Sequence, residues 1–299
     1  MPANFTSGWL GNGERAWHGM GVVTDGTLPA REAFETADAL FTVEKRELRV
    51  PIEVNRPGDT YLAGHGAVEF QPAGVFGVVR PDTQALLGYV SKQYEIVQND
   101  SLLRMAEFIR EEVDMDCVIV LSDGAKVCFT ATLRGAETDI VPGDTVKRRI
   151  VGYLGHDGKT GCGAMFTNIR VVCQNTLTAA MGEASARSSI THKNGANNNF
   201  DALIESIDVA RQDFVTECEL MREFSLASMG LNRFNSFVDE VYNINEGDVF
   251  RKREKLQRAF DAGYGSGYAP RSLWNGINAI TQIETSTLGT TSAKGRAQF

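Results

Sequence analysis

The sequence predicts an α+β fold: an antiparallel β-meander sheet with packed helices (a β-β-β-α-like core) and a helical C-terminal region. Three observations predict it. Apolar strand patterns alternate with tight turns in the middle of the chain, and Asp123-Gly124 between two of them is a strong hairpin signal. Helical patterns at residues 98–113 and 175–181 follow strands directly. Such hairpins favour an antiparallel sheet over a doubly wound parallel one.

The N-terminal part, residues 1–73, is predicted to be an arm followed by a hairpin. Its first 30 residues are rich in Gly, show little periodicity and carry two of the three Trp residues, so we expect an irregular arm that packs its aromatic rings onto a core or a neighbouring subunit. A helix is expected over residues 28–39, with Pro29 in its first turn. The alternating pattern that follows predicts a hairpin with its turn at residues 56–59.

The central part, residues 74–198, is predicted to hold the antiparallel α+β core. We expect a loop over residues 135–149, with a turn at Pro142-Gly143. The core ends at residues 165–181, where a strand pattern changes into a helical one. Polar and reactive side chains gather at this junction and can present donors to a ligand: Asn168, Arg170, Cys173, Gln174 and Asn175.

The C-terminal part, residues 199–299, is predicted to be helical and to end in a disordered tail. Apolar residues recur at helical spacing over residues 200–226, and shorter helices are expected in the remainder. The stretch before it, residues 182–199, has Gly, Ser and Asn in excess and is predicted to be a mobile loop.

Composition indicates an ordinary globular protein of the cytoplasm. No stretch approaches the roughly 20 apolar residues that cross a bilayer, and the N-terminus lacks the pattern of a secretion signal. The five Cys residues are widely spaced without a CxxC pair, which argues against a disulfide framework and a zinc knuckle. The net charge is −8, so a nucleic-acid site has to be a local basic strip on an acidic body.

The candidate nucleic-acid site is such a strip, on neighbouring strands and in the mobile stretch. Positive charge suits a phosphate backbone, and aromatic faces suit the bases of a single strand. The alternative for the basic run at residues 147–149 is the solvated end of a loop. The candidate residues are Lys147, Arg148, Arg149, Tyr153, Lys159, Phe166, Arg170, Arg187, His192 and Lys193.

Other chemistry is less well supported. A basic face at residues 251–258 is suited to phosphate or an acidic subunit, and its alternative is a salt-bridged surface helix. Cys173 lacks any local signature of a nucleophile. The four His residues have no metal-ligand spacing, and the pattern GxxxxGK[ST] is absent, so neither a metal nor a nucleotide cofactor is predicted.

Three stretches, YEIVQN at 94–99, TNIRVVCQNTL at 167–177 and SLWNGINAITQ at 272–282, resemble a phage- and plasmid-encoded protein family of uncharacterised function. The opening GERAWHGMG at 13–21 also fits that family. The order of strands and helix is similar to the core of single-strand annealing recombination proteins. That second resemblance implies a ring or filament that holds single-stranded DNA in a positive groove without ATP.

The sequence therefore predicts a phage or plasmid protein that binds and anneals single-stranded DNA in recombination or replication. Expected partners are single-stranded DNA, further copies in a homo-oligomer and a phage exonuclease, with no membrane and no cofactor. Two alternatives stay open. One is a phage structural or host-factor-binding oligomer that does not bind nucleic acid, and the other is a metal-dependent nuclease.

Overall fold

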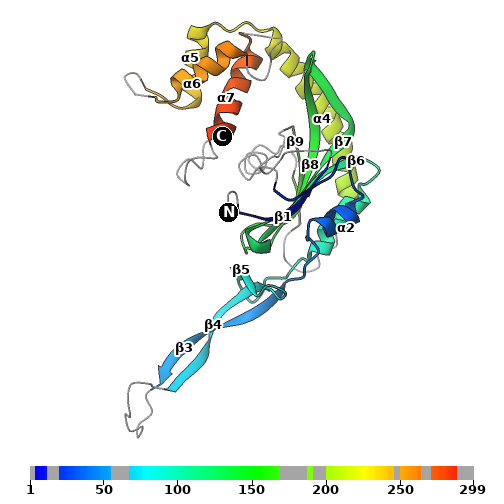
Figure 1. Ribbon diagram of the computed structural model, residues 1–299, viewed down its shortest axis with the longest axis vertical. Helices are drawn as coiled ribbons and strands as arrows, with labels where there is room; N and C mark the ends of the chain where they lie inside the picture. The colour runs from blue at the N-terminus through cyan, green and yellow to red at the C-terminus, as the bar shows by residue number, and fades with distance from the viewer. Residues whose placement is uncertain are drawn as a thin grey trace. The chain divides into compact units, whose positions relative to one another are not determined.

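The computed structural model describes residues 4–11, 20–54, 67–168, 187–190, 200–245, 250–263 and 271–287 (Figure 1). It confirms the predicted α+β class, with antiparallel pairing in both sheets and a helical C-terminal region. The chain forms two compact units, each built from several segments. Unit 1 comprises Met1–Ala131, Val151–Met165 and Arg187–Leu203, and unit 2 comprises Thr132–Ile150, Phe166–Ala186 and Ile204–Phe299. The three-part division expected from the sequence stays a prediction.

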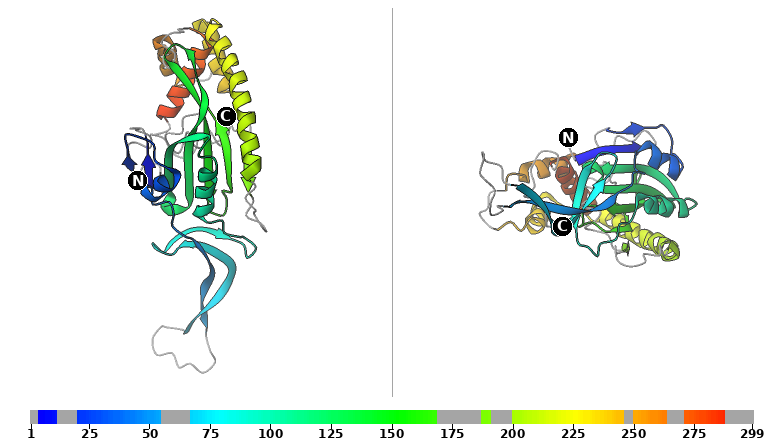
Figure 2. Two further views of the ribbon diagram at one scale, coloured as in Figure 1. Left: turned by 90° about the vertical axis from the view of Figure 1, so that its right-hand side faces the viewer. Right: turned by 90° about the horizontal axis from the view of Figure 1, so that it is seen from below.

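The larger sheet has seven strands in the order β10-β9-β8-β7-β6-β1-β2. Sequence neighbours lie side by side from β6 to β10, as in a meander, while β1 and β2 extend the other edge (Figures 1 and 2). The strands are β1 (Phe5–Leu10), β2 (Val22–Val23), β6 (Val113–Leu121), β7 (Lys126–Val141), β8 (Asp144–Gly155), β9 (Cys162–Thr167) and β10 (Arg187–Ile190).

The predicted irregular arm is wrong for residues 5–10, which form strand β1. This strand pairs antiparallel with β6 and parallel with β2. Trp9 is fully buried, and its indole N–H donates to the hydroxyl of Thr24 at 3.0 Å. A buried strand needs no alternation of polar and apolar residues, so the sequence pattern was too weak to reveal it.

The hairpin turn at Asp123-Gly124 is confirmed, because a short 3-10 turn, Ser122–Gly124, joins β6 to β7 with both residues at positive φ (59° and 107°). The expected loop over residues 135–149 is wrong. These residues lie in β7 and β8, and Pro142 and Gly143 alone separate the two strands. Gly143 has a φ of 87°, which suits a tight turn.

Two short helices of unit 1 contact each other, and α1 also packs against β1 and β6. These are α1 (Ala30–Thr36) and α2 (Asn99–Phe108), and the expected helix over residues 28–39 is therefore confirmed in its centre. The buried side of α2 presents Leu102, Leu103 and Met105 to the core. Buried apolar faces of this kind supply most of the stability of short helices.

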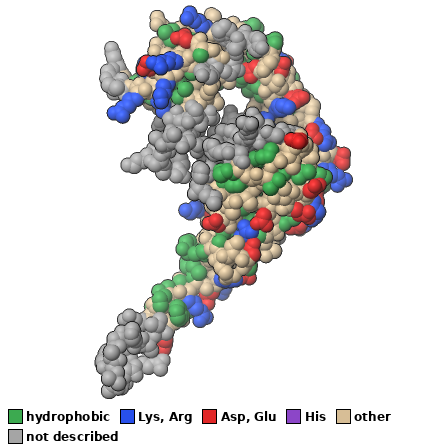
Figure 3. Space-filling model, in the orientation of Figure 1, with side chains coloured by type: hydrophobic (Ala, Val, Ile, Leu, Met, Phe, Trp, Pro, Cys, Tyr) green, Lys and Arg blue, Asp and Glu red, His purple; other side chains and the backbone are tan. Residues whose placement is uncertain are grey.

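The smaller sheet, also in unit 1, has the order β3-β4-β5 and is antiparallel throughout. It comprises β3 (Glu44–Val54), β4 (Ala67–Arg80) and β5 (Ala85–Val90). Residues 56–59, where the hairpin turn was expected, lie outside the described residues. Hydrophobic side chains remain exposed on this sheet, among them Phe70 and Tyr89, and Figure 3 shows a group of them along its strands.

Two glycines let β5 approach the turn between β8 and β9. A Cβ atom on Gly88 would lie 2.5 Å from the carbonyl carbon of Asp157, and one on Gly158 would lie 2.5 Å from the carbonyl oxygen of Tyr89. Gly158 also has a φ of 72°, which disfavours any other residue. The joint between the smaller sheet and this turn is therefore made by main chain against main chain.

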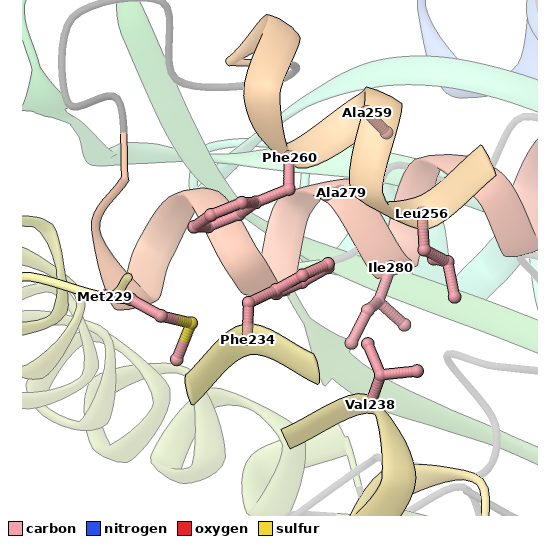
Figure 4. Close-up of a cluster of buried hydrophobic side chains, with 8 residues drawn as sticks. All are labelled: Met229, Phe234, Val238, Leu256, Ala259, Phe260, Ala279 and Ile280. Atoms are coloured by element: carbon pink, nitrogen blue, oxygen red, sulfur yellow. The ribbon is translucent and has the colours of Figure 1, made fainter. Parts of the chain in front are cut away.

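Unit 2 has a helical core of its own, drawn in Figure 4. The rings of Phe234 and Phe260 stack with centroids 4.2 Å apart and planes 6° from parallel. Val238, Leu256 and Ile280 surround them. The helices of this region are α4 (Phe200–Leu226), α5 (Leu231–Val241), α6 (Arg253–Ala262) and α7 (Leu273–Thr287), which confirms the predicted helical C-terminal region.

We predict that Gly152→Ala destabilises the protein by about 1–3 kcal/mol. An added methyl would lie 2.1 Å from the ring of Phe129, which is fully buried and has no room to move away. Urea unfolding measures the change. Gly26→Ala is the control, because its added methyl meets nothing within 4 Å, and we expect its effect to stay within about 0.5 kcal/mol. Equal effects of the two changes would contradict the steric argument.

Candidate nucleic-acid interface

The basic run at residues 147–149 lies inside strand β8, so its side chains cannot form one strip. Successive side chains of a strand point to opposite faces. Lys147 and Arg149 are half-buried on one side, and Arg148 is buried, with 2% of its surface exposed. Lys147 pairs with the carboxylate of Glu137 at 2.7 Å. The structure therefore separates Arg148 from the two basic residues beside it.

The buried Arg148 belongs to a polar cluster with Asn168 and Glu217, which are both partly exposed. One nitrogen of its guanidinium, Nη1, donates to the Asn168 carbonyl oxygen at 3.2 Å and to the Glu217 carboxylate at 2.9 Å. The Asn168 amide donates to that same carboxylate oxygen. The other two nitrogens, Nε and Nη2, are buried and have no hydrogen-bond partner in the part of the chain that the structure describes.

Glu217 is the residue of this cluster that the sequence analysis missed. It lies on α4, 69 positions from Arg148, next to the buried Cys218 and three positions after the buried Phe214. A carboxylate at the margin of an apolar helix face indicates that a cation from another segment of the chain lies against it. The reason is that a charged group removed from water needs a partner of opposite charge. Sequence spacing alone does not show which cation that is.

The remaining candidate residues are scattered. Phe166 is 3% exposed, so its ring has no free face for a base. Tyr153 is half-buried and Lys159 is exposed, and both belong to unit 1. Arg170, His192 and Lys193 lie outside the described residues, as do Cys173, Gln174 and Asn175 of the strand–helix junction, and the side chain of Arg187 is not described. Which of the predicted residues touch nucleic acid stays a prediction.

The basic face at residues 251–258 is exposed and belongs partly to helix α6. Lys255 and Arg258, three positions apart, lie on one side of α6, and Arg251 lies in the turn that precedes the helix. All three are exposed. Figure 3 shows Lys and Arg side chains over the region of α5 and α6. Arg258 pairs with Glu254, but its side chain is 76% exposed, so the pair is a weak surface interaction.

An aromatic pair lies beside the start of α6. The rings of Tyr242 and Phe250 have centroids 4.7 Å apart. The ammonium of Lys252 lies 5.7 Å from the Tyr242 ring, and the guanidinium of Arg253 lies 6.0 Å from the Phe250 ring. Cations over aromatic faces are held in place by the ring quadrupole. The segment thus places Lys252 beside the basic face, while the charge of Arg253 is balanced by the carboxylate of Asp239.

Thiol and metal chemistry find little support in the described residues. Cys117, Cys128, Cys162 and Cys218 are free and buried. Burial raises the pKa of Cys162 to about 11 and that of Cys128 further, so both stay protonated at neutral pH. In the part of the chain with described positions, no three His, Cys, Asp or Glu side chains are grouped to hold a metal ion.

Burial also raises the pKa of the Cys218 thiol, and charged groups of the Arg148 cluster shift that pKa as well. Arg222 and Arg148 lower that pKa, while Glu217 raises it. Two guanidinium groups and one carboxylate therefore act on the Cys218 thiol.

The chain belongs to the family of the domain of unknown function DUF932, whose model matches residues 86–288. The match covers both sheets in part and the helical region of unit 2, so it includes the Arg148 cluster and α6. No curated protein and no solved structure matches the chain. None of the described helices is both long and apolar enough to cross a membrane.

The turn that carries Lys159 is held by Asp157. Its carboxylate accepts hydrogen bonds from the backbone N–H groups of Thr160 (2.6 Å) and Lys159 (2.9 Å), and Lys126 lies 3.6 Å away. Burial alone raises the pKa of Asp157, but these hydrogen bonds outweigh it, and the pKa lies below its ordinary value. The ionised form is therefore favoured in the folded state.

We predict that Asp157→Asn lowers stability at pH 7 by about 1–2 kcal/mol. A carboxyl whose pKa is depressed on folding adds stability above its ordinary pKa of about 4, and that stability is lost as the pH falls through the lower, folded value. The difference between the variant and the natural chain should therefore shrink below about pH 4. Urea unfolding between pH 3 and pH 7 measures it, and a difference independent of pH would contradict the assignment.

Proposed function

We propose that this protein binds single-stranded DNA and anneals complementary strands as an ATP-independent oligomer, in the recombination or replication of a phage or plasmid. The observation that carries the proposal is the exposed basic face formed by Lys255 and Arg258 of α6 together with Arg251 in the turn before it. Residues 250–263 contain five basic and two acidic residues, a net charge of +3 on a chain whose net charge is −8. A local basic face of this kind attracts a polyanion that the remaining surface repels.

The chemistry of this face favours binding that does not depend on base sequence. Three exposed cations neutralise phosphates but offer few groups that read base edges. Annealing requires bases that remain accessible while the backbone is held. A row of cations on the outside of a helix meets that requirement, because it contacts the backbone alone.

The main contact with nucleic acid is therefore expected at the basic face of residues 251–258 and not on the strands of the sheet. Arg148 and Phe166, which were expected to contact phosphate and base, are buried. Lys159 is exposed in unit 1 and is retained as a secondary contact. The phage or plasmid origin is supported by the sequence resemblance, and the family description assigns no activity.

We predict that replacing Arg251, Lys255 and Arg258 together with Gln weakens binding of a single-stranded oligonucleotide roughly 100-fold at 0.1 M salt. Each phosphate contact contributes about 0.7 to the slope of log K against log salt for single strands, so three lost contacts lower that slope by about 2. Fluorescence anisotropy with a labelled oligonucleotide at several salt concentrations measures both quantities. An annealing assay without nucleotide, on the same variant, should show a parallel loss.

The matched control replaces Arg31, Arg104 and Arg110 of unit 1 with Gln. All three are exposed and pair with nearby acids, and the change in net charge is the same. We expect binding to stay within twofold of the natural chain. Equal weakening of both variants would mean that overall charge, and not α6, governs binding. Failure of the natural chain to bind single strands, or cleavage of them with Mg²⁺ or Mn²⁺, would favour the host-factor or nuclease alternative.

A further inference from the structure

We infer that the side edge of the Arg148 guanidinium is a binding site for one oxyanion, a phosphate or a carboxylate group. The Nε and Nη2 hydrogens of an arginine point in the same direction and match two oxygens of such a group. In Arg148 both nitrogens are buried without a hydrogen-bond partner among the described residues. The opposite nitrogen, Nη1, is held by Glu217 and Asn168. The guanidinium is therefore fixed in place with one complete edge unused.

The energetics favour an incoming ligand. A buried donor without an acceptor loses its hydrogen bonds to water and gains nothing in exchange, and the loss is larger for a charged group. Arg148 has two such nitrogens. A bidentate oxyanion would accept hydrogen bonds from both nitrogens at once. Its binding would therefore remove the unfavourable free energy of two buried donors that have no acceptor.

The electrostatics also favour an anion. Glu217 pairs with Arg148, and a second guanidinium, that of Arg222, also acts on the neighbouring Cys218. The Arg222 guanidinium donates to the hydroxyl of Thr138 and to the main-chain oxygen of Asp139, which are not charged groups.

Access to the site has a physical consequence. The Arg148 side chain is 3% exposed, so an oxyanion reaches it only through a local opening of unit 2. Binding should be saturable, unlike a general effect of salt on an exposed basic surface. This site is independent of the proposed function, because the basic face of α6 contributes none of its residues.

The test follows the thermal unfolding midpoint of the full chain in sodium phosphate and, separately, sodium acetate. Sodium chloride at the same ionic strength is the baseline. We expect a saturable rise with phosphate or acetate and none with chloride. Arg148→Lys keeps the charge but removes the paired donors, and we expect it to weaken the apparent affinity at least tenfold. Arg149→Lys, the same change one position along the strand, is the matched control and should leave the affinity unchanged.

A second variant keeps the test decisive if Arg148→Lys does not fold. Glu217→Gln retains the fixed guanidinium and removes the competing negative charge, so we expect oxyanion affinity to rise about fivefold or more. A midpoint that no oxyanion raises, or one that rises equally in all variants, would overturn the inference.

A single-stranded oligonucleotide that competes with inorganic phosphate for the site would identify a phosphodiester as the source of the oxyanion, and one that does not compete would identify a free anion. DNA binding without an oxyanion effect would leave the proposed function standing and remove this site alone.

Discussion

The ion pair between Arg148 and Glu217 is the interaction on which the arrangement of unit 2 depends most. Successive side chains of a strand point to opposite faces. Of the three consecutive basic residues in β8, the middle one therefore points inward. An isolated charge inside a protein is very costly. Arg148 is buried, whereas the Glu217 side chain that pairs with it is 36% exposed. Glu217 on α4 neutralises that charge at 2.9 Å, and Asn168 bridges the two groups. The pair thus fixes the register of a helix against a strand that is distant in sequence.

Much of the fold could be predicted from local signals. The turn at Asp123-Gly124 was recognised because the dipeptide adopts positive φ readily, and Gly124 does so at 107°. The long helix α4 was recognised from the apolar repeat that includes Ile207, Phe214 and Cys218, all of which are buried. These features depend on residues within a few positions of one another, which is the range over which a sequence pattern carries information.

The errors arose where distant contacts decide the structure. Strand β1 exists because β6 pairs with it across more than 100 residues, and Gly-rich sequence hides such a pairing. Charged and small residues interrupt the alternation of the strands on both sides of Pro142-Gly143, so the local pattern predicts a loop there. The candidate site suffered from the same limit. Lys147, Arg148 and Arg149 were grouped by adjacency in sequence, whereas the exposed cations of α6 are grouped by the geometry of a helix.

The contact of β5 with the turn between β8 and β9 bears on which positions of the smaller sheet tolerate substitution. Gly88 and Gly158 bring two stretches of backbone together without any side chain between them. A contact between two stretches of backbone does not depend on the identity of the neighbouring side chains. The outward residues of the smaller sheet can therefore be substituted without loss of this contact. Substitutions on the outward face of this sheet should therefore leave its attachment intact, whereas a side chain at position 88 or 158 should disturb it.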